Sequence, residues 1–305
     1  MGLSNVFCPL CQSGSHRSIK TWSADKEYTL MHCLQCDLQF WWPLERPNPT
    51  FYADADGYST HLPHVEVTDW PLIQSLLGGL SGKALDVGCG SGLLMRKMIE
   101  MGLEAWGVDF DSNAITVARA SGLDHLFAGP FEEYARTCIS SFDLMTCFDV
   151  LEHQNEPLVF VREIRRLLKP GGWFVGAVPN RGRFQWGENQ YCRPPFHFLE
   201  WSQASLYWLF QKEEFTVASL QVYEYGYLSL RTIEPFSWRI KSLVIYGGDQ
   251  GSNAAKLSLD TADRLRNLKQ LKDIIIAPAR LMESLIEKPF ARGAHILFKV
   301  QKTPA

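Results

Sequence analysis

The amino-acid sequence predicts an α/β fold, with helices on both faces of a mostly parallel sheet, preceded by a small metal-binding module. Between about residues 65 and 227, short apolar segments alternate with longer amphipathic ones, which is the pattern of βαβ units. A glycine-rich turn follows the first of these apolar segments. Two Cys-x-x-Cys pairs stand within the first 36 residues and predict the separate N-terminal module.

The paired cysteines of the N-terminal module have the spacing of a structural zinc site. The pairs are Cys8 with Cys11 and Cys33 with Cys36, separated by 21 residues. Those intervening residues contain strand-like segments on both sides of a polar turn, as in a zinc ribbon. Four cysteine ligands leave no open position for water or substrate, so the predicted Zn²⁺ is structural rather than catalytic. The alternative is two unrelated pairs of reduced thiols.

Three regions follow one another along the chain. We predict a zinc ribbon over residues 1–42, a connector over 43–64 that opens with the Pro-rich PLERPNP, and the main domain over 65–305. The aromatic run Phe40-Trp41-Trp42 is expected to pack the ribbon onto the main domain. Residues from about 228 to 292 interrupt the alternation and predict a helical insertion.

The strands and helices of the main domain are predicted from its apolar patterns. Strands are expected at 83–89, 104–110, 125–129, 142–150, 172–180 and 295–301, and helices at 93–102, 113–122, 157–169, 202–215 and 259–276. The segment LLKPGG predicts a helix end, because Pro170 and two glycines follow its last basic residue.

The stretch ALDVGCGSG (84–92) is the most informative motif, because Gly88, Gly90 and Gly92 lie between a strand and a helix. Glycines at such a turn let the backbone approach a ligand and present amides at a helix N-terminus. Asp109 ends the next strand, where a carboxylate suits the two hydroxyls of a ribose. The spacing differs from the dinucleotide fingerprint G-x-G-x-x-G, and the Gly-Lys-Ser/Thr of a Walker loop is absent. A tight turn without a ligand is the structural alternative.

With an acidic residue before its first glycine, DVGCGSG resembles motif I of class I S-adenosylmethionine (AdoMet) methyltransferases. SFDLMTCFDVLEHQNEP and REIRRLLKPGGWFVGAVPN extend the resemblance over about 83–180. It implies a Rossmann-like sheet of seven strands with an antiparallel last strand. It also implies cofactor-binding residues: Asp86, Gly88, Cys89, Gly90 and Gly92 at the methionine part, Asp109 at the ribose, Phe110 and Phe131 at the adenine, and Phe148 and Asp149 near the methyl sulfonium.

Two histidines are candidate general bases, because a hydroxyl or carbon nucleophile must lose a proton during methyl transfer. His197 lies in RPPFHFLEWS (193–202), which resembles the P-P-x-H-x-x-x-x-S loop of small-molecule methyltransferases. Only His197 and Ser202 match the Y-H-E-H-x-S-Y-F-S loop of sugar C-methyltransferases, whose second His is the base. The structural alternative for His197 is a hydrogen bond that fixes the loop backbone. His153 is the second candidate, and a structural role is favoured for it.

Composition and charge narrow the function classes. The net charge of −3 and the pI of about 6.3 argue against nucleic-acid binding. No run of eighteen apolar residues predicts a membrane span, and the N-terminus lacks the pattern of a secretion signal, so a cytoplasmic location is expected. Residues 236–305 carry 12 Lys and Arg against 6 Asp and Glu. Peripheral membrane contact is one interpretation of this basic segment, and a lid helix is favoured.

The sequence therefore predicts an AdoMet-dependent methyltransferase with a structural Zn²⁺. The cysteine pairs followed by DLQFWWPLERPNPTFYADADGY resemble the leader of bacterial methyltransferases that act on sugars, glycans and related metabolites. The expected substrate is thus a small molecule, namely a sugar nucleotide, glycan or related metabolite. Two alternatives are a ribosomal-RNA methyltransferase with an N-terminal zinc module and a non-catalytic binding protein that keeps the AdoMet fold.

Overall fold

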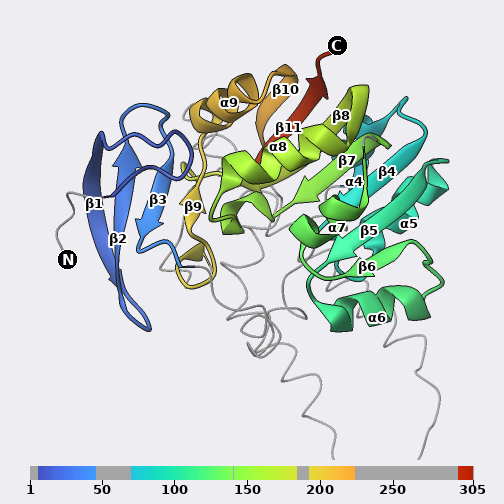
Figure 1. Cartoon of the computed structure of the whole chain (residues 1–305), viewed down its shortest axis with the longest axis horizontal. Coiled ribbons are helices and arrows are strands. Elements are labelled where there is room, and N and C mark those ends of the chain that lie inside the picture. Colours follow the sequence, from blue (N-terminus) through green and yellow to red (C-terminus); the bar gives the residue numbers. More distant parts are fainter. Residues whose placement is uncertain (1–5, 46–69, 140, 184–191, 224–294, 305) are drawn as a thin grey trace, which may run out of the picture.

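The computed structural model describes residues 6–45, 70–139, 141–183, 192–223 and 295–304, arranged around two β-sheets (Figure 1). One sheet has seven strands and the other has four. The smaller sheet lies at one side of the molecule, beside helix α9 (Gln203–Lys212).

The seven-stranded sheet confirms the predicted fold class. Its strands are β4 (Lys83–Val87), β5 (Glu104–Asp109), β6 (Leu126–Ala128), β7 (Phe142–Phe148), β8 (Leu168–Pro179), β10 (Phe215–Tyr223) and β11 (His295–Lys302). They lie in the order β10-β11-β8-β7-β4-β5-β6. Strands β8, β7, β4, β5 and β6 are parallel, and β11 is antiparallel to both of its neighbours. The strand order reverses between β4 and β7, and ligands of such sheets bind beyond the carboxyl ends of the strands at this point.

Helices cover both faces of this sheet (Figure 1). Helices α4 (Trp70–Leu77), α5 (Leu93–Glu100) and α6 (Ser112–Ala120) pack on one face. Helices α7 (Phe131–Thr137), α8 (Pro157–Leu167) and α9 pack on the other. In α8 the buried residues recur three or four positions apart, at Phe160, Val161, Ile164 and Leu167, so one stripe of the helix faces the sheet.

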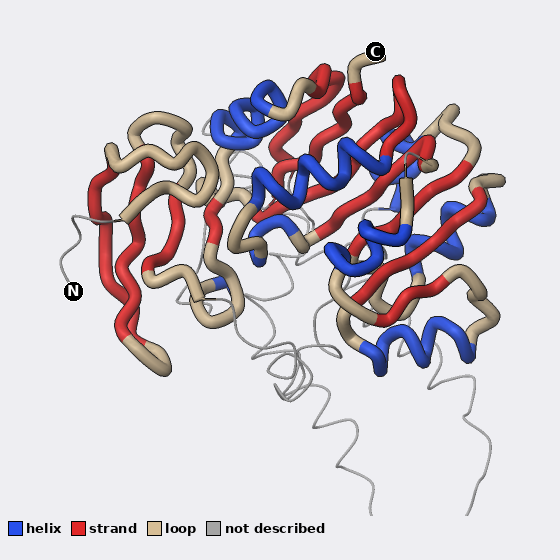
Figure 2. The backbone as a smooth tube through the Cα atoms, viewed as in Figure 1, coloured by secondary structure: helices blue, strands red, loops and turns tan. Residues whose placement is uncertain are grey.

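The smaller sheet takes one of its four strands from the main domain (Figure 2). One of the paired cysteines, Cys33, ends its second strand. Its strands are β1 (His16–Ser23), β2 (Glu27–Cys33), β3 (Gln39–Trp42) and β9 (Leu199–Glu200), joined antiparallel in that order. Phe40 and Trp41 are fully buried, and Trp41 packs in one cluster with Phe198. The rings of Phe40 and Trp41 therefore join the N-terminal sheet to the main domain, as predicted. Trp42 does not share this role, because it is 37% exposed.

Several elements differ from the sequence-based expectations. Helix α8 ends at Leu167, and residues 168–172, predicted as a helix end and turn, begin β8 instead. Lys169 stabilises this extended start, because its Nζ lies 2.8 and 2.9 Å from the carboxylate oxygens of Asp143 on β7. Helices α4 and α7 and strands β9 and β10 were not predicted. Most of the 43–64 connector and the whole 228–292 insertion lie outside the described residues.

Within the described part of the chain, no helix combines the length and apolar character that a bilayer crossing requires.

Candidate active site

The turn after β4 places three glycines beyond the carboxyl end of the central strand. Gly88, Gly90 and Gly92 have φ angles of 79°, 50° and 79°, in the left-handed region that favours glycine. A Cβ added at Gly88 would lie 2.4 Å from Cγ2 of Val150, and one at Gly92 would lie 2.2 Å from Cδ1 of Leu123. The backbone conformation therefore favours glycine at both positions, and an added Cβ would also displace the side chain of Val150 or Leu123.

The carboxylate of Asp109, at the end of β5, is bonded to this turn. Its Oδ2 accepts a hydrogen bond of 2.8 Å from the Gly90 amide, and its Oδ1 accepts one of 2.8 Å from the amide of Asp111. The amides of Gly88 and Cys89 donate to the carbonyl of Val108 at 2.8 and 3.2 Å. A carboxylate oxygen can accept more than one hydrogen bond, so Asp109 can hold the turn and still accept from ribose hydroxyls.

Asp86, the acidic residue before the first glycine, lies below the turn with only 2% of its surface exposed. Its Oδ1 accepts a 2.7 Å hydrogen bond from the hydroxyl of Thr146 on β7. Burial, and to a lesser degree the negative charge of Asp109, raises the pKa of Asp86 to about 7, against the effect of the Thr146 hydrogen bond. The carboxyl group can therefore gain or lose a proton near neutral pH.

We expect the raised pKa of Asp86 to make stability fall with pH. Between about pH 4 and about pH 7 the folded protein holds this proton more tightly than the unfolded chain, so ionisation costs on the order of 4 kcal/mol of unfolding free energy across that range. Asp86→Asn keeps an acceptor for Thr146 but has no proton to lose. Urea unfolding at about pH 5 and about pH 8 should show roughly two-thirds of this loss, because the step below pH 5 is not sampled, as an excess of the wild type over Asp86→Asn. Equal pH dependence in both proteins would contradict the prediction.

The other predicted cofactor residues lie in three different settings. The side chain of Cys89 is buried and points toward Gly107, where an added Cβ would lie 2.7 Å from its Sγ. This Sγ also lies 3.8 Å from the carbonyl oxygen of Gly90, within the turn. Phe131 is 7% exposed and packs against Phe160, with ring centroids 5.1 Å apart, inside the main core. Phe110 and Phe148 are half-buried at the ends of β5 and β7.

Asp149 follows β7 in a conformation that is uncommon for a residue with a side chain, with φ of 54°. Its amide donates to the carbonyl of Ala177 on β8 at 3.1 Å. Its Oδ1 lies 3.2 Å from Nε2 of His295, the first residue of β11. The end of β7 is thereby tied to its neighbour β8 and to β11, the strand on the far side of β8.

Both predicted histidines meet beyond the end of β7, together with a buried glutamate. The short helix η2 (Leu151–His153) supplies Glu152 and His153, and the loop before β9 supplies His197. The nearest side-chain donor atoms of these three residues all lie within 4.8 Å of one another, and carboxylate and imidazole are the donor types of a divalent-metal site. The two imidazole rings stand edge to face, with centroids 4.7 Å apart.

The two histidines have different surroundings. Nδ1 of His153 lies 2.7 Å from the carbonyl oxygen of Phe196, and because a carbonyl only accepts, His153 donates this bond and fixes the loop. Nε2 of His197 lies 4.0 Å from Oε1 of Glu152. The backbone-fixing role considered for His197 is thus observed for the ring of His153.

Burial dominates the electrostatics of this group. It lowers the pKa of His197 well below its usual range, and the positive charges of His153, Arg183 and His295 lower it further. Burial, followed by the charge of Asp149, raises the pKa of Glu152 well above its usual range. Glu152 is fully buried, and neither of its oxygens has a hydrogen-bond partner among the described residues. At neutral pH, His197 is therefore a neutral imidazole that can accept a proton.

Sequence reasoning missed Glu152 and His295 as site residues. Glu152 stands next to His153, and a glutamate in an apolar segment directly after a strand was a usable signal. His295 gave no such signal, because it lies far along the chain. Only the antiparallel pairing of β11 with β8, which sets His295 opposite Pro179, carries it to the carboxyl edge of the sheet.

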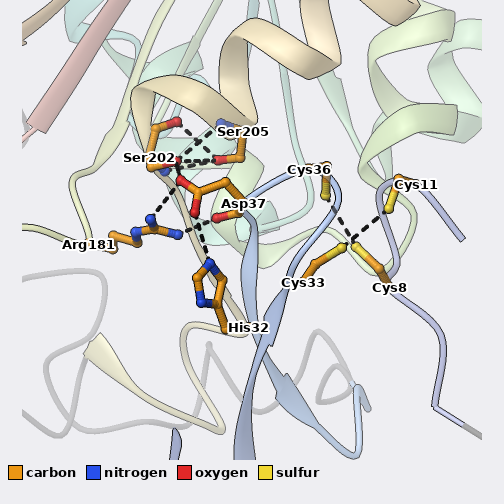
Figure 3. Close-up of polar contacts among 9 residues, drawn as sticks. All are labelled: Cys8, Cys11, His32, Cys33, Cys36, Asp37, Arg181, Ser202 and Ser205. Carbon is orange, nitrogen blue, oxygen red and sulfur yellow. Dashed lines mark hydrogen bonds and ion pairs between the residues drawn. The ribbon is translucent and has the colours of Figure 1, made fainter. Parts of the chain in front are cut away.

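The four paired cysteines converge beside the C-terminal end of β2 (Figure 3). The sulfurs of Cys8 and Cys36 are 3.5 Å apart, and those of Cys11 and Cys33 are 3.4 Å apart. Thiolates around one tetrahedral Zn²⁺ at about 2.3 Å stand roughly 3.8 Å from one another, so this arrangement fits the ion. The contact between the sulfurs of Cys8 and Cys36 lowers the pKa of Cys8 to about 6 and raises the pKa of Cys36, so without a metal one thiol of the pair keeps its proton.

Curated relatives match part of the main domain. Ubiquinone biosynthesis O-methyltransferase of Bordetella avium (strain 197N) is 38% identical over 115 residues, which is 36% of this chain and 48% of the relative. The protein of the same name from Sodalis glossinidius (strain morsitans) is 34% identical over 139 residues, 44% of this chain and 56% of the relative. The chain therefore spans about half the length of the curated relatives it matches.

Solved structures share the fold at low sequence identity. A SAM-dependent methyltransferase from Archaeoglobus fulgidus is 16% identical with a TM-score of 0.51, covering 78% of this chain and 93% of that one. Phosphoethanolamine N-methyltransferase 2 of Haemonchus contortus, solved with S-adenosyl-L-methionine, is 18% identical with a TM-score of 0.51, covering 87% and 62%. These likenesses, together with the sheet order, show the class I AdoMet-dependent methyltransferase fold.

The family model described as a methyltransferase domain matches residues 67–220, a segment that contains the glycine turn, Asp109 and both candidate histidines. Because this match covers half of the chain, the protein belongs to the methyltransferase domain family.

Proposed function

We propose that this protein is an AdoMet-dependent methyltransferase that methylates a hydroxyl group of a small molecule. One observation carries the proposal: the glycine turn with Asp109, and the group of Glu152, His153 and His197, occupy the same carboxyl edge of the sheet. A cofactor cradle next to a neutral imidazole is the arrangement that methyl transfer to a hydroxyl requires.

In the proposed methyl transfer, each side chain of the site has one role. AdoMet supplies an activated methyl group, so the protein mainly positions the reactants and excludes water. Asp109 holds the turn and accepts from the ribose hydroxyls. His197 accepts the hydroxyl proton as the oxygen bonds to the methyl carbon and the carbon–sulfur bond breaks. Phe110 and Phe148 are proposed to line the cofactor site from the ends of β5 and β7.

The proposed acceptor is a hydroxyl of a sugar nucleotide, glycan or related metabolite. The N-terminal cysteine pairs support this class, because they resemble the leader of methyltransferases that act on such molecules. The names of the curated relatives support an oxygen acceptor but point toward a quinone precursor. Release of S-adenosylhomocysteine should be measured with nucleotide sugars, hydroxylated aromatics and ribosomal RNA. Turnover with aromatics alone would reject the sugar class, and turnover with RNA alone would reject a small-molecule substrate.

Zn²⁺ is proposed to be bound by Cys8, Cys11, Cys33 and Cys36 as a structural ion. The sulfur separations and the meeting of all four cysteines support this assignment. Four thiolates complete a tetrahedral site, so the ion would stabilise the N-terminal sheet and leave the reaction to the main domain.

For the cofactor site, we expect Asp109→Ala to weaken AdoMet binding by about tenfold to a hundredfold. The variant loses an acceptor for the ribose and the 2.8 Å bond that holds the Gly90 amide, and hydrogen bonds to charged groups contribute about 1.5–3 kcal/mol. Titration calorimetry of both proteins with AdoMet measures the change. Asp124→Ala, which removes an exposed carboxylate from the loop before β6, is the matched control and should bind like the wild type. Unchanged affinity in Asp109→Ala would remove Asp109 from the cofactor site.

A further inference from the structure

The loop that carries His197 is bound on one side by the N-terminal sheet. Strand β9 begins two residues after His197 and pairs with β3, and the backbone amide of Trp41 donates to the carbonyl of Phe198 at 2.9 Å. Near the other end of the loop, the indole Nε1 of Trp22 donates to the carbonyl of Pro194 at 3.1 Å. The N-terminal sheet thus holds the chain before and after His197.

The main domain binds the same loop from its other side. His153 donates from Nδ1 to the carbonyl of Phe196 at 2.7 Å, and the amide of Phe198 donates to the carbonyl of Glu152 at 3.2 Å. His197 therefore lies between two residues that are bonded to η2. Its position depends on how the N-terminal sheet is set against the main domain.

Asp37 connects these two parts through one carboxylate (Figure 3). Asp37 directly follows Cys36, and its Oδ2 accepts bonds of 2.6 Å from the hydroxyl of Ser202 and 2.6 Å from Nη2 of Arg181. Its Oδ1 lies 2.8 Å from Nε2 of His32, and its carbonyl accepts from Nη1 of Arg181.

Two side-chain partners of Asp37, Ser202 and Arg181, stand at the C-terminal end of the loop. Ser202 is the N-cap of α9, directly after β9, and Arg181 follows β8. The backbone amide of Arg181 donates to the carbonyl of Trp201 at 2.9 Å. A residue adjacent to one cysteine of the proposed zinc site is therefore bonded to the C-terminal end of the segment that carries His197, directly at Ser202 and through Arg181 at Trp201. Hydrogen bonds from a guanidinium to a carboxylate are strong and directional, so they transmit position well.

We propose that Asp37 is a positioning residue that transmits the geometry of the second cysteine pair to the loop carrying His197. Binding of zinc by the four cysteines would fix the Cys33–Asp37 turn. Asp37 would then position the loop through its bonds to Arg181 and Ser202. The inference rests on the proposed function, since it gives the loop a role in methyl transfer. It explains how an N-terminal metal module acts on the reaction without contacting the reacting atoms.

The test compares Asp37→Asn with Gln12→Asn in the zinc-loaded full-length protein. Each residue directly follows the second cysteine of its pair with positive φ, 64° at Asp37 and 60° at Gln12, and Asn tolerates that conformation. Gln12 is exposed, so its substitution is the matched control. Zinc content, AdoMet affinity, methyl transfer and hydrogen–deuterium exchange of residues 193–202 are measured for each protein.

Asp37→Asn is expected to keep its zinc and its AdoMet affinity. Its amides in 193–202 should exchange at least about tenfold faster, and its kcat should fall at least about tenfold. Arg181→Met, which removes the partner at a distance from the cysteines, should give the same two changes. The double variant should add little, because both substitutions break one connection. Chelation of zinc from the wild type should also accelerate exchange in 193–202, and Gln12→Asn should behave like the wild type.

Unchanged exchange and unchanged kcat in both zinc-loaded variants would overturn the proposal. Loss of zinc in Asp37→Asn together with wild-type exchange in Arg181→Met would overturn it as well, because Asp37 would then serve the metal site alone. Hydrogen–deuterium exchange of residues 193–202 can be measured even in a protein that shows no methyl transfer. Absence of AdoMet binding in the wild type would defeat the proposed function, while the link between Asp37 and the loop would still be judged by exchange.

Discussion

Replacement of His197 by Ala is expected to lower kcat by about a hundredfold to ten-thousandfold, while the Kd for AdoMet stays within about twofold to threefold. The imidazole is neutral, since burial holds its pKa well below the usual range. It can therefore accept the proton that a hydroxyl must lose. The glycine turn and Asp109 do not depend on this side chain, so cofactor binding should survive its loss.

Single-turnover methyl transfer and calorimetry together test this prediction. His125→Ala is the matched control, because it removes an exposed imidazole that lies in the loop before β6, stacked on Trp106. Added imidazole should restore part of the activity of His197→Ala if the lost group is a base. A variant with wild-type kcat would reject His197 as the base, and loss of AdoMet binding would reassign it to the cofactor site.

His153→Ala offers a useful contrast with His197→Ala. His153 donates to the carbonyl of Phe196, so its loss should loosen the loop instead of removing the base. Added imidazole should therefore leave the activity of His153→Ala unchanged. The two histidines are neighbours with ring centroids 4.7 Å apart, and this contrast separates their roles.

The cofactor half of the site could be predicted from sequence because its determinants are local. The glycine turn, Asp86 and Asp109 lie within two consecutive βα units, and the backbone rules that shape such turns act over a few residues. The parallel sheet was likewise predictable, since β7 and β8 are apolar along most of their length, as strands covered on both faces are.

The rest of the candidate site, which is the loop carrying His197 and its contacts with the N-terminal sheet, depends on contacts between distant segments. β9 joins the N-terminal sheet through only two residue pairs, a signal too short for periodicity to reveal. Asp37 reaches Arg181 and Ser202 across more than 140 positions of sequence. For Phe131, its place after the third strand predicts contact with adenine, and the structure adds a contact between its ring and Phe160 that the local sequence did not reveal.

Substitution of Gly88 by Ala is expected to weaken AdoMet binding by more than about a hundredfold. The new Cβ would lie 2.4 Å from Cγ2 of Val150, and φ of 79° is unfavourable for any residue with a Cβ. The Val150 side chain, the turn or both must shift to relieve this contact, and we expect the shift of the turn to draw the Gly90 amide away from Asp109. Calorimetry with AdoMet measures the loss, and circular dichroism verifies that the variant is folded.

Gly122→Ala separates backbone strain from the clash. Gly122 has φ of 88°, close to that of Gly88, but a Cβ there meets no atom within 4 Å. Its substitution should therefore cost about 1–2 kcal/mol of stability and leave AdoMet affinity unchanged. An affinity loss in Gly122→Ala as large as that in Gly88→Ala would show that strain or general destabilisation, and not the site, explains the result.

Removal of the Val150 methyl group that the new Cβ would contact tests directly whether this clash causes the loss of AdoMet affinity. Val150→Ala deletes Cγ2, and the Cβ that remains is 3.8 Å from the added atom, which is ordinary van der Waals contact. The double variant Gly88→Ala with Val150→Ala should thus recover much of the affinity that Gly88→Ala loses, measured against Val150→Ala alone. Recovery would locate the cofactor cradle between the β4 turn and the end of β7. Additive losses would mean that this contact does not shape the binding site.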